Sequence, residues 1–206
     1  MTTGGDAARR LDAVILAAGA GVRFGGGKLT APWRAGRLID GGLAAAFAAP
    51  ARSVTLVWGA DASVPETARE WAVANGVVER LNLVAAADHA QGLSASLKAG
   101  IASLAADCAG AFIFLGDMPR IPHEISSALA GHLTDQTLAA VPTYQGRRGH
   151  PVLIRPDLFA EVAALQGDQG LGAVLRRLGP AVAEIEAPDD GVLFDVDRPG
   201  DLAGLG

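Results

Sequence analysis

Short apolar runs alternate with longer amphipathic segments along most of this 206-residue chain. Such alternation is typical of βα units, because a helix must carry the chain back across the sheet between parallel strands. It therefore predicts an α/β fold of three layers, in which helices cover both faces of a mostly parallel sheet. The predicted strands cover residues 13–17, 54–58, 81–84, 111–115, 138–141, 152–154, 182–185 and 192–196.

Helix signals occur between these runs. Residues 63–66, Ser-Val-Pro-Glu, predict a helix that starts with a capping box and has a proline in its first turn. Residues 93–104 and 156–165 are further predicted helices. No internal repeat or linker divides the pattern, so residues 11–206 are predicted to form a single domain after a disordered tail at residues 1–10.

The composition predicts a folded protein and argues against several classes of partner. Half of the residues are apolar and 19% are charged, which excludes a disordered chain. The net charge of −5 argues against a binder of nucleic acid or membrane surfaces, and no run approaches the roughly 18 apolar residues of a membrane helix. Cys108 is the one cysteine, so the chain has no disulfide framework. We expect a cytoplasmic protein.

A glycine-rich loop follows the first predicted strand. Residues 16–28 read Leu-Ala-Ala-Gly-Ala-Gly-Val-Arg-Phe-Gly-Gly-Gly-Lys, so Arg23 and Lys28 lie among five glycines. Glycine leaves backbone N–H groups free to face a ligand, and a concave row of such donors beside two cations suits phosphate oxygens. A P-loop needs Ser or Thr where Leu29 stands, and a dinucleotide fingerprint needs glycine where Phe24 stands. The loop predicts phosphate binding of another type, with a flexible surface turn as the alternative.

Aspartates follow two of the apolar runs. Asp117 comes shortly after residues 111–115, and Asp195 and Asp197 follow the last run. Acids at the carboxyl ends of parallel strands lie where open α/β sheets bind ligands, and Mg²⁺ is usually held by one or two such carboxylates. Alternation along a strand would place Asp195 and Asp197 on the same side. The alternative role for these acids is to cap turns or helices that begin at the prolines two residues further on.

The loop at residues 16–28 resembles the signature of the nucleotidyltransferases that build the dinucleotide form of the molybdenum cofactor. Their pattern reads Leu-Ala-Ala/Gly-Gly, then Arg-Met-Gly and Lys, and Phe24 replaces the methionine here. Residues 116–119, Gly-Asp-Met-Pro, resemble the family's acid motif, and residues 195–202 resemble its Asp-x-Asp-Thr-Pro-x-Asp-Leu ending. Ala18 matches the cytidylyl members, which favours CTP over GTP. The resemblance implies a nucleotide-diphospho-sugar transferase type of fold, with a Rossmann-like nucleotide-binding half followed by a substrate-binding half.

The resemblance also implies roles for individual residues. The nucleotide would be bound by Leu16, Ala17, Ala18, Gly19, Gly21, Arg23, Lys28, Ser96 and Lys98. The acceptor would be bound by Gly149, His150, Pro151, Asp168 and Gly170. Asp117 and Asp197 would hold Mg²⁺, with Asp195 as the alternative second ligand. The catalytic residues would be Lys28, Arg23 and Asp117.

Two further groups of polar residues have open interpretations. Arg147 and Arg148 replace a commoner Pro-Gly pair before the Gly-His-Pro motif, and could either clamp a phosphate or lie in a solvated loop. The remaining histidines, His89, His123 and His132, lack metal-ligand spacing, so we expect them to be structural or surface residues.

The reaction implied by the family is attack of an acceptor's terminal phosphate on the α-phosphorus of CTP, with release of pyrophosphate and with Mg²⁺ as cofactor. Such a nucleophile is already anionic, so catalysis can rest on positioning and charge stabilisation without a general base. The implied acceptor is molybdopterin, and a molybdoenzyme or its chaperone would receive the product. The alternatives are a related enzyme that uses GTP or a sugar or methylerythritol phosphate, and a non-catalytic maturation protein that binds the cofactor.

Overall fold

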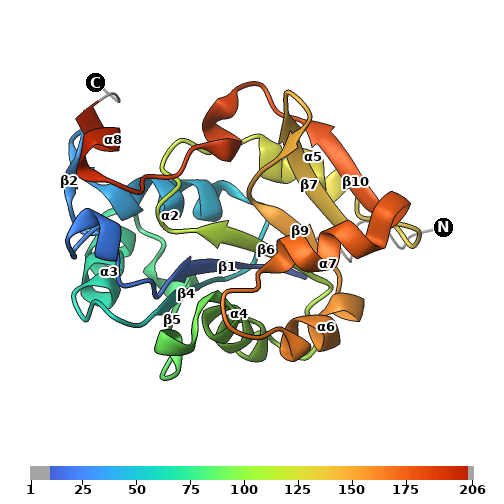
Figure 1. Ribbon diagram of the computed structural model, residues 1–206, viewed down its shortest axis with the longest axis horizontal. Helices are drawn as coiled ribbons and strands as arrows, with labels where there is room; N and C mark the ends of the chain where they lie inside the picture. The colour runs from blue at the N-terminus through green and yellow to red at the C-terminus, as the bar shows by residue number, and fades with distance from the viewer. Residues whose placement is uncertain (1–9, 204–206) are drawn as a thin grey trace.

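A twisted sheet runs through the centre of the molecule and has helices on both faces (Figure 1). The computed structural model describes residues 10–203. The strands are β1 Leu11–Ala17, β2 Pro32–Trp33, β3 Gly36–Arg37, β4 Val54–Trp58, β5 Leu81–Ala85, β6 Gly110–Leu115, β7 Ala139–Tyr144, β8 Arg147–Arg148, β9 Val152–Ile154 and β10 Val182–Glu186. In the main sheet they lie in the order β10, β7, β9, β6, β1, β4, β5, with β8 paired to β7, while β2 and β3 form a separate hairpin.

The pairing confirms the predicted α/β fold with a mostly parallel sheet. Strand β1 pairs in parallel with both β4 and β6, and β4–β5 and β7–β10 are parallel pairs as well. The exceptions are β9, which runs antiparallel to β6 and β7, and the short β8, which runs antiparallel to β7, and they make the sheet mixed. In the β1–β6 register Leu16 lies beside Leu115. The loop after β1 and the loop after β6 therefore leave the sheet side by side.

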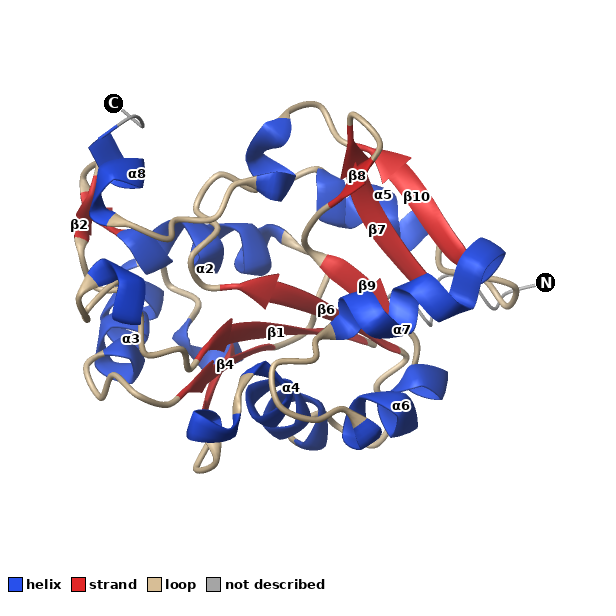
Figure 2. Ribbon diagram, in the orientation of Figure 1, coloured by secondary structure: helices blue, strands red, loops and turns tan. Residues whose placement is uncertain are grey.

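Seven α-helices of the described residues form the outer layers (Figure 2). They are α2 Leu38–Ala48, α3 Val64–Ala74, α4 Leu93–Ala102, α5 Ile125–Gly131, α6 Phe159–Ala164, α7 Leu171–Leu178 and α8 Pro199–Ala203. Buried residues of α2, α3 and α5 share one core with Ala13 and Ile15 of β1, whereas those of α4, α6 and α7 share the other core with Val14 and Leu16. Both faces of β1 are buried, which explains why its sequence is almost uninterruptedly apolar.

The prediction of a strand at residues 192–196 is wrong. The chain forms a short 3-10 helix at Asp190–Leu193 and continues without regular structure. Val192 and Val196 are buried, but their backbone groups bond to loops: the Val192 carbonyl accepts from the His150 N–H at 2.8 Å, and the Val196 N–H donates to the Asp117 carbonyl at 3.0 Å. The apolar run therefore reflects burial beside the loops of the candidate site, and no strand aligns Asp195 with Asp197.

One detail of a predicted helix is wrong, and one helix was missed. Helix α3 begins at Val64 as expected, but no capping box forms, because the Ser63 hydroxyl donates to Asp61 at 2.6 Å and does not cap the helix. Helix α2 was not predicted, since the adjacent Gly41 and Gly42 lower helix propensity. The structure shows their purpose: a Cβ on Gly41 would collide with the carbonyl of Pro119, so α2 can approach the loop after β6 only with glycine there.

The predicted disordered tail lies outside the described residues apart from Arg10, which forms a turn into β1. Every helix within residues 10–203 is too short or too polar to span a lipid bilayer.

Candidate active site

The loop after β1 turns back on itself through a left-handed glycine. Gly21 has φ +58°, and its carbonyl accepts hydrogen bonds from the N–H groups of Phe24, Gly25 and Gly26 at 2.9–3.2 Å. A Cβ on Gly21 would lie 3.1 Å from the Cβ of Lys28. This close approach brings the end of the loop back beside its beginning, so that Lys28 lies next to the carboxyl end of β1.

Lys28 connects three segments that are far apart in the sequence. Its ammonium nitrogen Nζ lies 2.5 Å from Oδ2 of Asp117 and 2.9 Å from the carbonyl oxygen of Val196. Only 13% of the Lys28 side chain and 23% of the Asp117 side chain are exposed. Because this pair is poorly hydrated, its attraction is screened less than that of a surface pair. The glycine-rich loop, the loop after β6 and the segment before α8 therefore meet at one ammonium group.

Arg23 makes the second contact between the loop and the acids. Its guanidinium donates to Oδ2 of Asp197 at 2.8 Å, but the arginine side chain is 73% exposed. The backbone N–H groups of Asp197 and Arg198 donate to the Asp201 carboxylate at 2.9 and 2.7 Å, and these bonds lower the pKa of Asp201. Asp201 thus fixes the turn that presents Asp197. Its position in the Asp-x-Asp-Thr-Pro-x-Asp-Leu pattern is the signal that sequence reasoning did not use.

The aspartates form one acidic group. Loss of water around Asp195 and then the negative charges of Asp117 and Asp197 raise the pKa of the Asp195 carboxyl group, although the residue still reaches the surface. Among residues 10–203, no three His, Cys, Asp or Glu side chains are grouped so as to hold a metal by themselves. Mg²⁺ usually takes one or two carboxylates and completes its shell with water and phosphate oxygens. The donors present suit such a shared ion and do not suit a structural metal cage.

A cleft of about 540 Å³ opens beside this group of acids. Asp117 and Asp168 line this cleft. It is also lined by four of the residues expected to bind the nucleotide, which are Leu16, Ala18, Gly19 and Ser96. A small adjoining pocket of about 70 Å³ is lined by Ala17, Gly21 and Lys28. The structure therefore brings most of the nucleotide set together. Asp168, expected to bind the acceptor, lines the same cleft as the residues expected to bind the nucleotide.

Lys98 does not line the cleft beside Asp117, whereas His89 does. Lys98 is two residues beyond Ser96 on α4, so its side chain leaves the helix about 200° away and lines a different surface cavity. His89, expected to be a structural or surface residue, lines the cleft beside Asp117. Its Nδ1 lies 3.0 Å from the carbonyl oxygen of Ala86. The sequence at His89 and Ala90, directly before Gln91-Gly92, carries no motif that would have predicted the position of His89 in the cleft.

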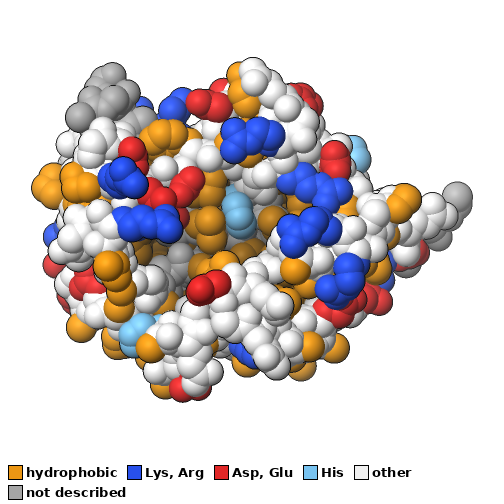
Figure 3. Space-filling view, in the orientation of Figure 1, with side chains coloured by type: hydrophobic (Ala, Val, Ile, Leu, Met, Phe, Trp, Pro, Cys, Tyr) orange, Lys and Arg blue, Asp and Glu red, His pale blue; other side chains and the backbone are white. Residues whose placement is uncertain are grey.

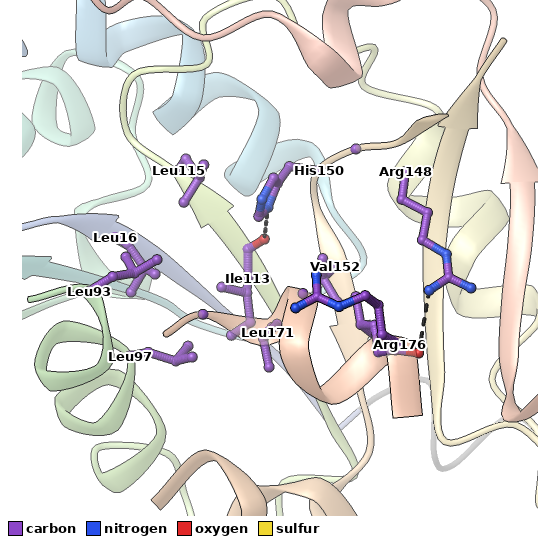
Figure 4. Close-up of a pocket in the computed structure, with 14 residues that line it drawn as sticks. Leu16, Leu93, Leu97, Ile113, Leu115, Arg148, His150, Val152, Leu171 and Arg176 are labelled. Atoms are coloured by element: carbon purple, nitrogen blue, oxygen red, sulfur yellow. Dashed lines mark hydrogen bonds between the residues drawn. The ribbon is translucent and has the colours of Figure 1, made fainter. Parts of the chain in front are cut away.

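A second pocket of about 350 Å³ adjoins the first and is mainly apolar (Figure 4). Gly149, His150 and Gly170, all expected to bind the acceptor, line it, whereas Pro151 does not. Its apolar walls are Leu16, Leu93, Leu97, Ile113, Leu115, Val152, Leu171 and Leu175, of which Leu16, Leu93 and Leu115 also line the cleft. The two cavities thus share a wall at the ends of β1 and β6. Figure 3 shows this face hollowed, with basic and acidic side chains gathered around the hollow.

His150 lies in the second pocket as a neutral group. Its Nδ1 is 3.4 Å from the carbonyl oxygen of Ile113. Burial lowers the pKa of His150, and the Ile113 carbonyl and the charge of Asp117 oppose this only in part. The imidazole can therefore orient a ligand by hydrogen bonding without placing a fixed positive charge in an apolar pocket.

Residues 13–182 match the family of MobA-like NTP transferase domains. The chain is 26% identical to the molybdenum cofactor cytidylyltransferase of Escherichia coli over 93% of each protein. It is also similar to the solved structure of the Mycobacterium sp. strain JC1 homologue of Mycobacterium tuberculosis rv0371c, with a TM-score of 0.78, 26% identity, and coverage of 96% of this chain and 95% of that one. A nucleotidyl transferase from Methanothermobacter thermautotroptrophicus shares the fold, with a TM-score of 0.76 at 20% identity over 95% of both chains. These matches confirm the resemblance expected from the motifs: the chain belongs to the MobA-like NTP transferase family and is a nucleotidyltransferase.

Proposed function

We propose that this nucleotidyltransferase transfers CMP from CTP to the terminal phosphate of molybdopterin, with release of pyrophosphate and with Mg²⁺ as cofactor. The observation that carries the proposal is the position of Lys28. Its ammonium joins the glycine-rich loop to Asp117 beside a cleft that adjoins a second, mainly apolar pocket. A triphosphate and the bulkier body of an acceptor could thus be held with their reacting groups next to each other.

The choice of substrates is supported by the relative and by the motifs. The Escherichia coli relative is named as a molybdenum cofactor cytidylyltransferase. Ala18 lines the cleft and matches the cytidylyl pattern of the loop. The apolar walls of the second pocket suit a planar heterocyclic body better than a polyol phosphate, whose hydroxyl groups would need hydrogen-bond partners there. A molybdoenzyme or its chaperone would then receive the product.

The chain's own residues can supply most of the catalysis. Lys28 and Arg23 would bind the β- and γ-phosphates, and Lys28 would stabilise the charge that develops on the leaving pyrophosphate. Mg²⁺ held by Asp117 and Asp197, with Asp195 as the alternative second ligand, would supply charge stabilisation at the transferred phosphoryl group. The neutral imidazole of His150 would orient the acceptor. The attacking phosphate is already an anion, so no residue has to remove a proton from it.

We also propose that the reaction takes place in the cytoplasm. The chain has a single cysteine and an acidic net charge, and none of its described helices can cross a membrane. Fusing the full chain to a fluorescent reporter in its native cells would test this location.

The decisive experiment measures pyrophosphate release by the full-length protein. Molybdopterin is supplied with CTP or GTP, and with and without a chelator of Mg²⁺. We expect release with CTP, less with GTP, and none after chelation. The variant Asp117→Asn, which keeps the shape of the side chain but removes its charge, should lose the Mg²⁺-dependent release and remain folded by circular dichroism.

Three results would contradict the proposal, each in a different way. Preference for GTP would overturn the base assignment. Turnover only with a sugar or methylerythritol phosphate would overturn the acceptor. Binding of CTP with no turnover on any acceptor would favour a maturation protein that binds the cofactor without reacting it.

A further inference from the structure

The second pocket has an apolar end and a basic end. On one side in Figure 4 lie Leu16, Leu93 and Leu115, which also line the cleft beside Asp117. On the other side lie two arginines, Arg148 and Arg176. Asp117 lines the cleft, so the reacting phosphate of an acceptor must lie toward the leucines. The arginines therefore face the opposite end of the acceptor, away from the chemistry.

Arg148 is held in place by the protein. Its guanidinium donates through Nε to Glu184 at 2.8 Å, a second nitrogen lies 2.6 Å from the same oxygen, and a third donates to the carbonyl of Leu175 at 3.3 Å. Glu184 balances its charge, and the bond to Leu175 attaches it to α7. Arg148 thus forms a fixed polar edge of the pocket.

Arg176 differs from Arg148 and Arg177 because it pairs with no acidic side chain of the described residues. Within residues 10–203 no ion pair or hydrogen bond links its side chain to another group, whereas the adjacent Arg177 pairs with Glu161 on α6. One guanidinium nitrogen of Arg176 lies 3.6 Å from the place that a Cβ on Gly172 would take, so the side chain folds back over the first turn of α7. In Figure 4 it reaches from α7 toward the interior of the pocket. Arg176 is exposed at the border of this mainly apolar cavity, and within residues 10–203 its charge has no protein partner.

We infer that Arg176, with Arg148 beside it, binds an electron-rich group at the end of the acceptor remote from its reacting phosphate. A guanidinium offers several N–H donors in one plane and is weakly hydrated, so it suits a carbonyl or oxyanion group on a planar body. The acceptor is accordingly a phosphomonoester with an apolar, planar body and a carbonyl or oxyanion group at its far end. The inference rests on the proposed function and adds which residues select the acceptor.

The test compares Arg176→Met with Arg177→Met in the full-length protein. Methionine keeps an unbranched apolar side chain and removes the charge, and Arg177 is a matched control on the same helix whose partner, Glu161, lies on α6 and does not line the pocket. With molybdopterin as acceptor, Arg176→Met should raise its KM by about tenfold or more, as expected for a lost charge-assisted hydrogen bond. The KM for CTP should not change. Arg176→Lys should recover part of the loss, and the acceptor KM of the wild type should rise with salt more steeply than that of Arg176→Met.

The outcomes separate this inference from the proposed function. If the wild type turns over molybdopterin but both methionine variants have the same acceptor KM, Arg176 does not select the acceptor. If Arg176→Met raises the KM for CTP as much as that for the acceptor, the arginine acts on the whole site and the inference is wrong. If the wild type releases no pyrophosphate with molybdopterin, the proposed function fails, and the assignment of Arg176 fails with it.

Discussion

At the scale of single residues, two ion pairs of similar length contribute unequally to the electrostatics of the candidate site. The Lys28–Asp117 pair is mostly buried, whereas the Arg23–Asp197 pair is largely exposed. Exposed pairs contribute about 0–1 kcal/mol to stability, because water and salt screen them and two flexible side chains must be ordered. We therefore expect Lys28 to dominate the electrostatics of the site, and Arg23 to act mainly when a polyphosphate is bound.

Replacing Lys28 tests this ranking. Lys28→Ala should lower kcat/KM for CTP by about 30- to 1000-fold, equivalent to about 2–4 kcal/mol, because the ammonium would stabilise charge on the leaving group. Arg23→Ala should cost less. Arg69→Ala, which removes an exposed cation 3.9 Å from Glu66 on α3, should leave kinetics unchanged. Initial rates of pyrophosphate release measure all three, and equal losses in the Arg23 and Lys28 variants would refute the ranking.

At the scale of secondary structure, the packing of α2 against the loop after β6 supports the position of Asp117. Gly41 lies against the backbone of Pro119, and a Cβ on Gly42 would lie 3.4 Å from the carbonyl oxygen of Gly116. Both contacts border the Asp117 loop. Glycine is unfavourable in a helix by roughly 0.5–1 kcal/mol relative to alanine. These two glycines therefore lower the stability of α2 by itself, but they allow α2 to pack closely against the loop after β6.

Two glycine-to-alanine variants should therefore have opposite effects. Gly41→Ala should lower the free energy of unfolding by about 1–3 kcal/mol, since backbone must move to admit the methyl group. Gly131→Ala in α5 should raise it by about 0.5–1 kcal/mol, because a Cβ there meets nothing within 4 Å. Urea denaturation measures both, and Gly41→Ala should also reduce the rate of pyrophosphate release. A stabilising effect of Gly41→Ala would show that α2 can move away freely.

Predictability at this scale depends on whether the signal is local. The run that became β1 was recognised because burial on both faces leaves an apolar sequence of strand length. Residues 192–196 carry a similar run and are not a strand, because Val192 and Val196 are buried against loops. Apolar composition reports burial in both cases. It does not report whether the backbone finds its hydrogen-bond partners in a neighbouring strand or in a loop.

At the scale of the whole molecule, the site joins the beginning and the end of the described chain. Lys28 Nζ donates to the carbonyl of Val196, and the N–H of Val196 donates to the carbonyl of Asp117. These bonds hold three segments of the chain together: Asp117 lies 89 residues from Lys28 in the sequence, and Val196 lies 168 residues from it. A bound polyphosphate would add contacts to the same segments, so binding and folding should be coupled.

This coupling predicts stabilisation by substrate. At a CTP concentration of 100 times its Kd, the free energy of unfolding should rise by about 2.7 kcal/mol if CTP binds only the folded protein. The rise in Tm should be larger with Mg²⁺ than with a chelator, and Asp117→Asn should abolish that difference. Differential scanning calorimetry measures each case. A CTP-induced rise in Tm that does not depend on Mg²⁺ in the wild type would contradict the assignment of Asp117.

The α/β class, most of the strands, the glycine-rich loop and the aspartates that follow apolar runs could be predicted from the sequence alone, because each of these is encoded in a short stretch of neighbouring residues. Which of these features lie next to one another depends on the three-dimensional fold. Lys28 reaches Asp117 because β1 and β6 are adjacent strands, and Ser96 but not Lys98 lines the cleft because one face of α4 turns inward. Arg176 lines the second pocket because of the position of α7, whose Leu175 carbonyl accepts a hydrogen bond from Arg148 of β8. Such contacts depend on strand order and helix orientation, which are set by burial over the whole chain and leave no local pattern.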